Sequence, residues 1–452
     1  MVASGVTKQY AAALAGNLAA MMSGMVMSWS SPALGKLGLW TSEEESWAGS
    51  LAALGAAFGP WVGGWGADRL GRRGVLLWSA VPATLGWAML MAAEHPDLPH
   101  DGKIGLLYAA RLISGAAVGV VYVALPMYIG EMSQPSIRGA LGTLMQLIIS
   151  LGMMVMYGAG PYISTLALGG ISLVVPLLFA AAFFWMPETP YQFLQKDDVA
   201  GADKALQWFR DEGADTSGEL KVMQEAAEEL RRNKASMGDL FRVRGNVLAL
   251  CLSLGLVLFQ QLSGINAVLF YGQDIFQQAN TGLGAEVSQI VVGAVMIVAS
   301  CITPLAVDRL GRKPLLLISA VGMAIADVAL GTYFYVLEYQ DASSLGWLPV
   351  TSLVVYIFVY SPGFGALPWA VMGEIFPTNV KALASSLTAS FCWLVAFLIT
   401  KFFSQISSSL GAYTPFWFFS VCCIAAALFV VFLLPETKGR RLEEIQAILN
   451  KR

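Results

Sequence analysis

Charged side chains are scarce in this sequence of 452 residues. Asp, Glu, Lys and Arg make up 13% of it, whereas an average soluble domain carries about 25%. Because 56% of the residues are hydrophobic, the chain is not an ordinary soluble enzyme. The net charge of -3 and the lack of any sustained basic stretch also exclude nucleic acid as a partner.

Histidine and cysteine are also rare, with two and five residues. The histidines fall together in one short polar segment. The cysteines fall inside apolar runs, without the spacings that bind metals or build a disulfide framework. We therefore expect no metal, no cofactor and no histidine-based catalytic centre, and hence no enzyme activity. These residues are His95, His100, Cys251, Cys301, Cys392, Cys422 and Cys423.

Long apolar runs, by contrast, fill the chain. A bilayer core about 30 Å thick requires about 20 mostly apolar residues per helix. Twelve such windows are bounded by charges, Pro or Gly: 11–33, 47–67, 74–94, 105–127, 140–161, 164–186, 246–273, 286–306, 314–337, 346–372, 382–404 and 412–434. The sequence therefore predicts an all-α membrane protein with twelve transmembrane helices in contact with the lipid bilayer.

The distribution of Lys and Arg predicts how these helices are oriented. An even number of spans places both termini on one side of the membrane, and basic residues collect on the cytoplasmic side. All 27 Lys and Arg residues fall on the side of the termini except Lys36, Lys103, Arg111 and Lys401. We expect a multi-pass integral membrane protein with both termini in the cytoplasm, and the plasma membrane as its location.

One long polar segment interrupts the apolar pattern. Between residues 187 and 245, acids and bases alternate at helical spacings, as at Glu228 and Arg232. We expect a cytoplasmic helical linker that serves as a spacer or latch. The predicted organisation is a six-helix half over 1–186, the linker over 187–245, a second six-helix half over 246–434 and a cytoplasmic tail over 435–452.

The loops of the two halves repeat each other. VDRLGRK (307–313) repeats ADRLGRR (67–73), GEIFPTNVKA (373–382) matches GEMSQPSIRG (130–139), and PETK (435–438) repeats PETP (187–190). The matches keep their order and nearly the same spacing, which indicates an internal duplication. In transporters built from such halves, the substrate lies between them near the middle of the membrane.

The repeated loops carry acids and bases at matched positions. Such clusters form ion pairs that hold the ends of neighbouring helices together in one conformation and release them in another. Positive-inside topology alone would require no matched acids. We predict that these residues gate the cytoplasmic side: Asp68, Arg69, Arg72, Arg73, Glu131, Arg138, Glu188, Asp308, Arg309, Arg312, Lys313, Glu374, Lys381 and Glu436.

Several motifs together resemble the sugar porter family of the major facilitator superfamily. They are GGWGADRLGRR, PMYIGEMSQPSIRG, PETPYQFL, FQQLSGINAVLFY, PWAVMGEIFP and PETKGRRLEEI, in order along nearly the whole chain. WSSPA (29–33) and WLVAFLITKFF (393–403) are similar to the intracellular-type facilitative glucose transporters and the insect facilitated trehalose transporters. The resemblance implies the major facilitator fold and transport of a small-molecule sugar, glucose or trehalose, by alternating access. We expect a monomer.

The apolar spans offer few groups that could bind a sugar. Sugar hydroxyls need partners that both donate and accept, beside aromatic rings, and Gln or Asn next to Trp or Tyr meets this need. Gln261 and Asn266 lie about 140° apart on an ideal helix, so both line one cavity only if the helix breaks between them. We expect that break at Ser263 and Gly264, and a second flexible helix around Pro362–Pro368.

The resemblance assigns roles to single residues. Gln146, Gln260, Gln261, Asn266 and Trp369 match positions that bind the sugar, and Tyr271 and Trp393 match aromatic positions that line or gate the site. Two positions depart from the family pattern, because Met296 stands where Asn or Gln is frequent and Cys392 where Asn is frequent. Both changes are expected to remove hydrogen-bonding partners from the C-terminal half.

The mode of coupling is open to three interpretations. Proton-coupled sugar porters resemble one another in pairing an Asp of the first span with an Arg of the fourth. Here the basic residue is Arg111, but the matching first-span residue is Ser30, which favours uniport. The alternatives are a proton symporter that uses Asp327, and a sugar sensor that does not transport, although the tail after Pro435 is short for signalling.

Overall fold

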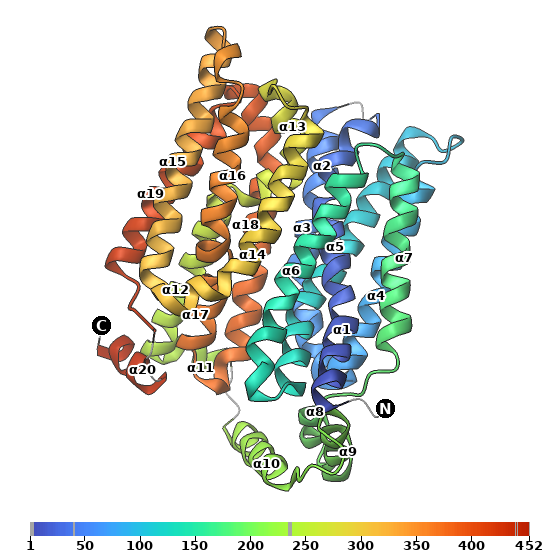
Figure 1. Cartoon of the computed structure of the whole chain (residues 1–452), viewed down its shortest axis with the longest axis vertical. Helices are drawn as coiled ribbons and strands as arrows, with labels where there is room; N and C mark the ends of the chain where they lie inside the picture. Colours follow the sequence, from blue (N-terminus) through green and yellow to red (C-terminus); the bar gives the residue numbers. More distant parts are fainter. Residues whose placement is uncertain (1–3, 39–40, 234–236, 439, 441, 452) are drawn as a thin grey trace.

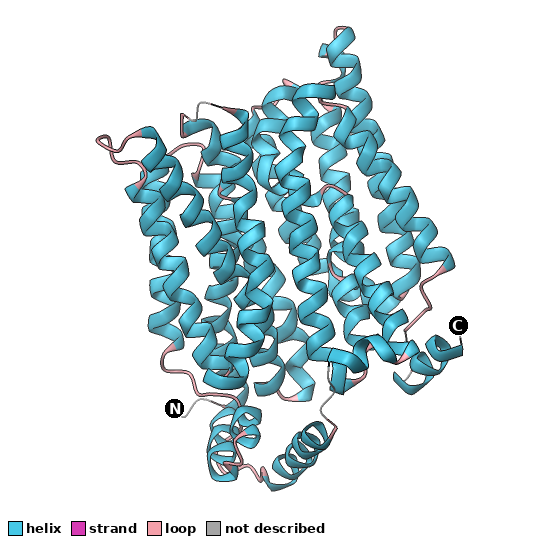
Figure 2. Cartoon of the chain, turned by 180° about the vertical axis from the view of Figure 1, so that it is seen from behind, coloured by secondary structure: helices cyan, strands magenta, loops and turns pink. Residues whose placement is uncertain are grey.

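The computed structural model describes residues 4–38, 41–233, 237–438, 440 and 442–451. Every regular element in this part of the chain is a helix (Figure 2). Most helices run side by side in one bundle, and both termini lie at the end that carries the helices of the polar segment (Figure 1). We call this end of the bundle the linker end and the opposite end the far end.

The N-terminal half of the bundle contains the first six predicted spans. The first span is interrupted near the far end, where α1 passes into two short helical turns. The helices of this half are α1 (Gly5–Ser28), α2 (Ser30–Ala33), η1 (Leu34–Lys36), α3 (Ser42–Leu70), α4 (Arg72–Ala92), α5 (His100–Met132), α6 (Pro135–Ala159) and α7 (Thr165–Phe183).

The C-terminal half contains the remaining spans, two of which are broken into pieces. Its helices are α12 (Arg244–Leu262), α13 (Ile265–Ala279), α14 (Ala285–Leu310), α15 (Arg312–Tyr339), η2 (Ser343–Leu345), α16 (Leu348–Tyr360), η3 (Ser361–Gly365), α17 (Leu367–Ile375), α18 (Thr378–Leu410) and α19 (Thr414–Phe432). The short α20 (Leu442–Lys451) follows at the linker end (Figure 1).

The polar segment between the halves is helical, as its charge pattern indicates. It forms α8 (Pro190–Gln195), α9 (Val199–Phe209), α10 (Ser217–Arg232) and α11 (Met237–Arg242). The expected pair of Glu228 and Arg232 is present on α10 at 3.4 Å. The segment is attached to the N-terminal half, because Gln9 Nε2 donates to the carbonyl of Phe209 at 2.7 Å and Arg210 Nη1 to that of Met132 at 3.2 Å.

Eleven of the described helical segments are long and apolar enough to cross a bilayer. The predicted second span, α3, falls outside this set, and three glutamates occupy its first turn. Thr41 and Glu44 form a capping box that begins this 29-residue helix. Because α3 packs along α5 and α18 within the bundle, we count it as the twelfth span.

Glycine allows α3 and α5 to approach closely. A Cβ atom on Gly59 would lie 2.4 Å from the Cα of Gly119, closer than real atoms come. Small residues at a helix contact replace the hydrophobic driving force that is missing inside a bilayer. The contact holds α5, the helix that carries Tyr122 and Arg111, against α3.

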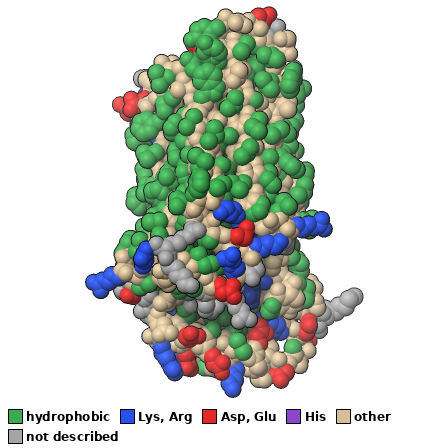
Figure 3. Space-filling view, turned by 90° about the vertical axis from the view of Figure 1, so that its left-hand side faces the viewer, with side chains coloured by type: hydrophobic (Ala, Val, Ile, Leu, Met, Phe, Trp, Pro, Cys, Tyr) green, Lys and Arg blue, Asp and Glu red, His purple; other side chains and the backbone are tan. Residues whose placement is uncertain are grey.

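The surface of the bundle matches a membrane slab. Hydrophobic side chains cover the upper part of the face in Figure 3, and most of the charged groups, among them the Lys and Arg side chains, gather around the linker end below it. Aromatic side chains are exposed toward both ends, with Trp185 78% exposed where α7 meets the linker and Trp347 60% exposed where α16 begins. Such rings anchor a protein at the two membrane interfaces.

Candidate functional site

The seventh span breaks where the sequence predicts. α12 ends at Leu262 and α13 begins at Ile265. Between them Gly264 has φ +90°, a conformation that side chains rarely adopt, and a Cβ atom there would lie 2.3 Å from the ring of Phe419. The break turns Gln261 and Asn266 toward each other, and the Asn266 amide donates to Gln261 Oε1. This prediction is confirmed.

Three amides and one thiol form a single buried cluster, which we call the amide cluster: Gln260, Gln261, Asn266 and Cys392. Gln261 Nε2 donates to Cys392 Sγ at 3.1 Å and to Gln260 Oε1 at 3.4 Å. The Cys392 thiol donates in turn to Gln260 Oε1 at 3.6 Å. The expectation that Cys392 removes a hydrogen-bonding partner is therefore wrong. A thiol can both donate and accept a hydrogen bond, although weakly, and Cys392 does both.

The tenth span is also interrupted. Ser361–Gly365 forms a stretch of π-helix, η3, between α16 and α17. It falls in the region around Pro362 where the sequence predicts a flexible helix, and the flexibility itself stays a prediction. The wider turn leaves carbonyl groups free for side chains. Gln260 Nε2 donates to the carbonyl of Phe364 at 2.6 Å and to that of Gly365 at 3.4 Å. The two broken helices thus meet at the amide cluster.

Tyrosines surround the cluster. The Tyr356 hydroxyl donates to the carbonyl of Ser263 at 2.8 Å, which supports the helix break. Tyr360 stacks on Tyr356, with ring centres 6.1 Å apart, and lies near Gln260 and Cys392. Sequence reasoning missed these residues, although a tyrosine inside an apolar span was a usable signal, because a buried hydroxyl requires a partner.

The two aromatic residues implied by the resemblance lie at contacts. Trp393 of α18 packs edge-on against Tyr122 of α5, with ring centres 5.4 Å apart. Tyr271 is buried in α13, where its hydroxyl donates to the carbonyl of Thr400 at 3.0 Å and its ring stacks on Phe403. Trp393 therefore touches the other half of the bundle, and Tyr271 joins α13 to α18. Met296 is buried in α14.

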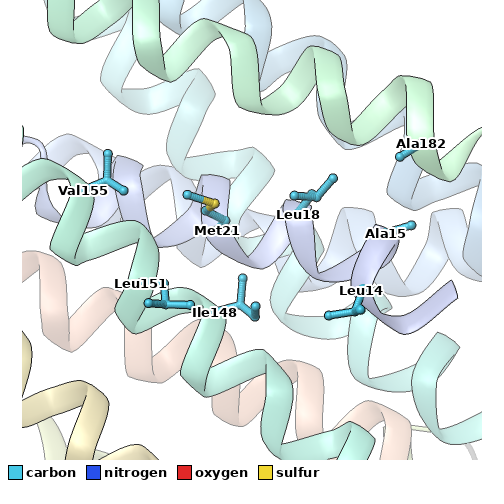
Figure 4. A pocket seen from close by; sticks show the side chains of 8 residues that line it. All are labelled: Leu14, Ala15, Leu18, Met21, Ile148, Leu151, Val155 and Ala182. Carbon is cyan, nitrogen blue, oxygen red and sulfur yellow. The ribbon is translucent and has the colours of Figure 1, made fainter. Parts of the chain in front are cut away.

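A groove of about 540 Å³ lies on the outer side of the bundle between α1, α6 and α7 (Figure 4). Its lining is wholly apolar, and Leu14 on its rim is 50% exposed. No side chain there can bind a hydroxyl group. The lining residues are Leu14, Ala15, Leu18, Met21, Ile148, Leu151, Val155 and Ala182. This groove is not the sugar site.

Gln146 faces the opposite way from that groove. It shares an exposed stripe of α6 with Gly139, Gly142 and Thr143, at helical spacings of three and four. Ile148, which lines the outer groove, lies about 200° around the helix from Gln146. The stripe therefore faces the interior, which indicates that the bundle is open from the linker end up to Gln146. The structure gives no hydrogen bond from the amide cluster to Gln146, or to the half-buried Trp369, among the described residues.

Hydrogen bonds between the halves collect at the far end and the middle of the bundle. At the far end, backbone groups of the broken seventh span take part in most of them. The contacts are Ser30 Oγ to Phe270 O at 3.0 Å, Tyr157 OH to Leu269 O at 3.0 Å, Gln273 N to Ser31 Oγ at 3.1 Å, Ser46 Oγ to Lys401 O, and Ser150 Oγ with Ser300 Oγ at 3.3 Å.

At the linker end, each half has the same pattern of ion pairs. Arg72 pairs with Glu131 at 2.9 Å, and Arg312 pairs with Glu374 at 2.6 Å. A threonine also donates to each glutamate: Thr189 to Glu131 at 2.6 Å and Thr437 to Glu374 at 2.5 Å. The repeated loops therefore fold into repeated structures, and these pairs join helices within one half.

A second acid of each repeat caps a helix. Glu188 accepts from the backbone N–H of Arg73 at 3.0 Å, and Glu436 accepts from that of Lys313 at 3.0 Å. Burial opposes ionisation of Glu436, but four backbone N–H groups outweigh it and lower the pKa of this carboxyl. A carboxylate at a helix N-terminus also interacts favourably with the helix dipole.

Other predicted gating residues make no ion pair in the described part of the chain. Arg138 donates to the carbonyl of Ser133, and Lys381 to that of Gly373. Arg69 lies over the ring of Trp65, and Asp68 is exposed. Arg309 contributes only its carbonyl, to Lys438. The side chain of Asp308 lies outside the described residues.

Arg111 and Asp327 are both buried in the bundle. Arg111 donates to the carbonyls of Val26 at 2.7 Å and Ala48 at 3.0 Å, and its guanidinium lies 5.0 Å from the ring centre of Trp29. Asp327 of α15 accepts a long hydrogen bond of 3.9 Å from the thiol of Cys423 in α19. The interpretation of Asp327 as an acid bonded to a neighbouring helix agrees with this contact.

Known proteins resemble this chain along its whole length. The profile of the family described as sugar (and other) transporter matches residues 3–449. A protein of Apis mellifera ligustica named facilitated trehalose transporter Tret1 is 36% identical over 449 residues, which cover 97% of this chain and 88% of that protein. Its namesake from Anopheles gambiae is 37% identical over 97% of this chain, which spans 55% of that longer protein.

A solved structure shares the fold. The proton:xylose symporter XylE bound to 6-bromo-6-deoxy-D-glucose, a major facilitator superfamily protein, superposes with a TM-score of 0.80 at 23% identity, covering 98% of this chain and 99% of that one. The bundle is therefore the major facilitator fold, as the sequence predicts. With the profile matched from residue 3 to residue 449 and relatives above 30% identity over nearly its full length, this integral membrane protein belongs to the sugar transporter family, whose members are not enzymes.

Proposed function

We propose that this protein is a facilitative transporter that carries trehalose down its gradient by alternating access. The main support is the full-length similarity to relatives named facilitated trehalose transporters. A buried cluster of amides between two broken helices suits a ligand rich in hydroxyl groups, because each amide both donates and accepts. The relatives' names favour trehalose over glucose, the other sugar that the sequence leaves open.

In this proposal the sugar binds to Gln146, Gln260, Gln261, Asn266 and Trp369, with Tyr271 and Trp393 beside it. The amides of the cluster bond to one another and to backbone carbonyls. A sugar hydroxyl can replace one such bond at little net cost, since each exchange trades one hydrogen bond for another. Gln146 then contributes from the N-terminal half, at the head of the open stripe of α6.

Transport then follows from movement of the two halves, 1–186 and 246–434, about the site. The contacts between the halves at the far end support a state that is closed there and open at the linker end. The ion pairs of Arg72 and Arg312 keep the helix ends of each half together. Their release and reformation accompany the opposite opening.

We propose uniport because the partners of Arg111 are uncharged. A carbonyl or a tryptophan ring does not take up a proton, whereas a carboxylate partner would be neutralised by one and would then release the arginine. Ser30 stands at the position where proton-coupled sugar porters carry an Asp, and its hydroxyl donates to the carbonyl of Phe270. The linker end, with most of the Lys and Arg residues, faces the cytoplasm, and the protein acts as a monomer in the plasma membrane.

Uptake into liposomes tests the proposed function. The purified protein is reconstituted without a pH or voltage gradient, and uptake of labelled trehalose and labelled glucose is measured. Saturable trehalose uptake that excess glucose does not block is the expected result. Uptake of glucose alone would make the protein a hexose uniporter, and uptake only with an inward proton gradient would make it a symporter.

A further inference from the structure

Tyr122 of the N-terminal half contacts an aromatic residue next to the amide cluster. Among the described residues, no other ring of this half has such a contact. The ring of Tyr122 packs edge-on against Trp393, the neighbour of Cys392 in sequence. Tyr122 also lies near Cys392 itself and near Tyr360. Gln146 is the residue of the N-terminal half that the resemblance assigns to sugar binding. It is exposed on α6 and has no such contact among the described residues.

The hydroxyl of Tyr122 has a poor partner. It donates to Met27 Sδ at 3.6 Å, and a thioether sulfur is a weak acceptor. Other buried tyrosines of the bundle, such as Tyr157 and Tyr271, donate to backbone carbonyls at 3.0 Å. A phenol hydroxyl inside a membrane bundle therefore remains available for a stronger acceptor.

Tyr122 also lies on an accessible side of its helix. It is partly exposed, and Pro126, one turn closer to the linker end on the same face of α5, is exposed. Next on that face is Gly130, with open space beside it. Tyr122 thus stands at the head of a second open stripe, matching Gln146 at the head of the stripe on α6. Both stripes run toward the linker end, from which the sugar enters in the proposed function.

We propose that Tyr122 is a further sugar-binding residue. Its hydroxyl gives up the hydrogen bond to Met27 and donates instead to an oxygen of the sugar. The inference rests on the proposed sugar transport and extends its site to α5. The ring of Tyr122 contacts Trp393 of the other half. Tyr122 therefore couples sugar binding to the relative position of the two halves.

The test compares Tyr122→Phe with Met27→Leu in reconstituted protein. Tyr122→Phe keeps the ring against Trp393 and removes only the hydroxyl, and we expect KM for trehalose to rise about fivefold to tenfold while the maximal rate changes little. Met27→Leu keeps the bulk but removes the sulfur acceptor, which leaves the hydroxyl free, so KM should stay unchanged or fall. Tyr162→Phe changes an exposed loop tyrosine and controls for the replacement of a tyrosine by phenylalanine away from the site.

The outcomes separate this inference from the proposed function. If the unmodified protein transports trehalose and Tyr122→Phe has the same KM, the inference fails and the function stands. An equal rise in KM for Met27→Leu and Tyr122→Phe would mean that the hydroxyl only positions α1, and would also overturn the inference. If the unmodified protein takes up no sugar under any gradient, the proposed function fails and the inference with it.

Discussion

Gln261 lies at the centre of the amide cluster, because its amide bonds to three neighbours. It donates to Gln260 and Cys392 and accepts from Asn266. In Gln261→Ala, these groups lose their common partner and the sugar loses one amide. We predict that trehalose uptake falls about tenfold or more, with protein amount in the membrane unchanged, as measured by initial uptake rates normalised to reconstituted protein.

Gln278→Ala is the matched control, since this glutamine of α13 is exposed near the far end. It should leave uptake unchanged. Equal uptake by Gln261→Ala and the unmodified protein would remove Gln261 from the site.

Asp327 is the buried carboxyl that separates uniport from symport. Its bond to the Cys423 thiol at 3.9 Å joins α15 to α19, and Asn can accept the same bond. We predict that Asp327→Asn leaves trehalose uptake in the absence of a gradient unchanged. Uptake with and without an inward proton gradient checks this. Loss of a gradient-driven component in the variant would instead assign the proton to Asp327.

At the scale of the element, the break between α12 and α13 depends on one glycine. Gly264 has φ +90° and touches the ring of Phe419. Gly264→Ala forces an L residue into the left-handed region, which costs about 1–2 kcal/mol, and adds a clash. We predict a lower unfolding temperature in detergent together with weaker trehalose uptake, because the break orients Asn266 toward Gln261.

Gly170→Ala provides the comparison, because this glycine of α7 has open space around it. It should leave both the unfolding temperature and uptake unaltered or slightly raise stability. A Gly264→Ala variant as stable and active as the Gly170→Ala variant would show that the break tolerates a side chain.

At the scale of the whole molecule, the two halves repeat one structure with unequal burial. The side chains of Arg72 and Glu131 are 4% and 18% exposed, whereas those of Arg312 and Glu374 are 19% and 28% exposed. Gln192 and Gln195 of α8 also accept from Arg72, at 2.5 and 3.0 Å. The linker therefore covers the pair of the N-terminal half.

This asymmetry predicts different costs for equivalent substitutions. Glu131→Ala leaves a buried guanidinium without its carboxylate, at a cost of about 3–5 kcal/mol, whereas Glu374→Ala breaks a more exposed pair worth about 1 kcal/mol. Glu131→Ala should lower the unfolding temperature more. Glu374→Ala should mainly shift the balance of states, seen as altered labelling of single cysteines at the linker end. Equal losses of stability would contradict the prediction.

Much of this architecture could be predicted from the sequence. The twelve spans follow from apolar length, although α3 falls outside the set of helices that are apolar enough to cross a bilayer, since Gly, Trp and Pro make up much of its sequence. The helix break at Gly264 could be predicted because two amides on one helix can meet only across a bend. The hydrogen bonds of the Cys392 thiol could not be predicted, since they depend on two glutamines of another helix.

The sequence by itself determined the class of the molecule, its duplication and the residue types of its site, because these depend on local composition and spacing. Only the tertiary structure decided which groups meet. It brought Tyr122 to Trp393, surrounded Arg111 with carbonyls and placed the pairs of Arg72 and Arg312 within single halves. Contacts between distant helices depend on how the spans pack, and apolar spans with similar patterns leave that packing undetermined.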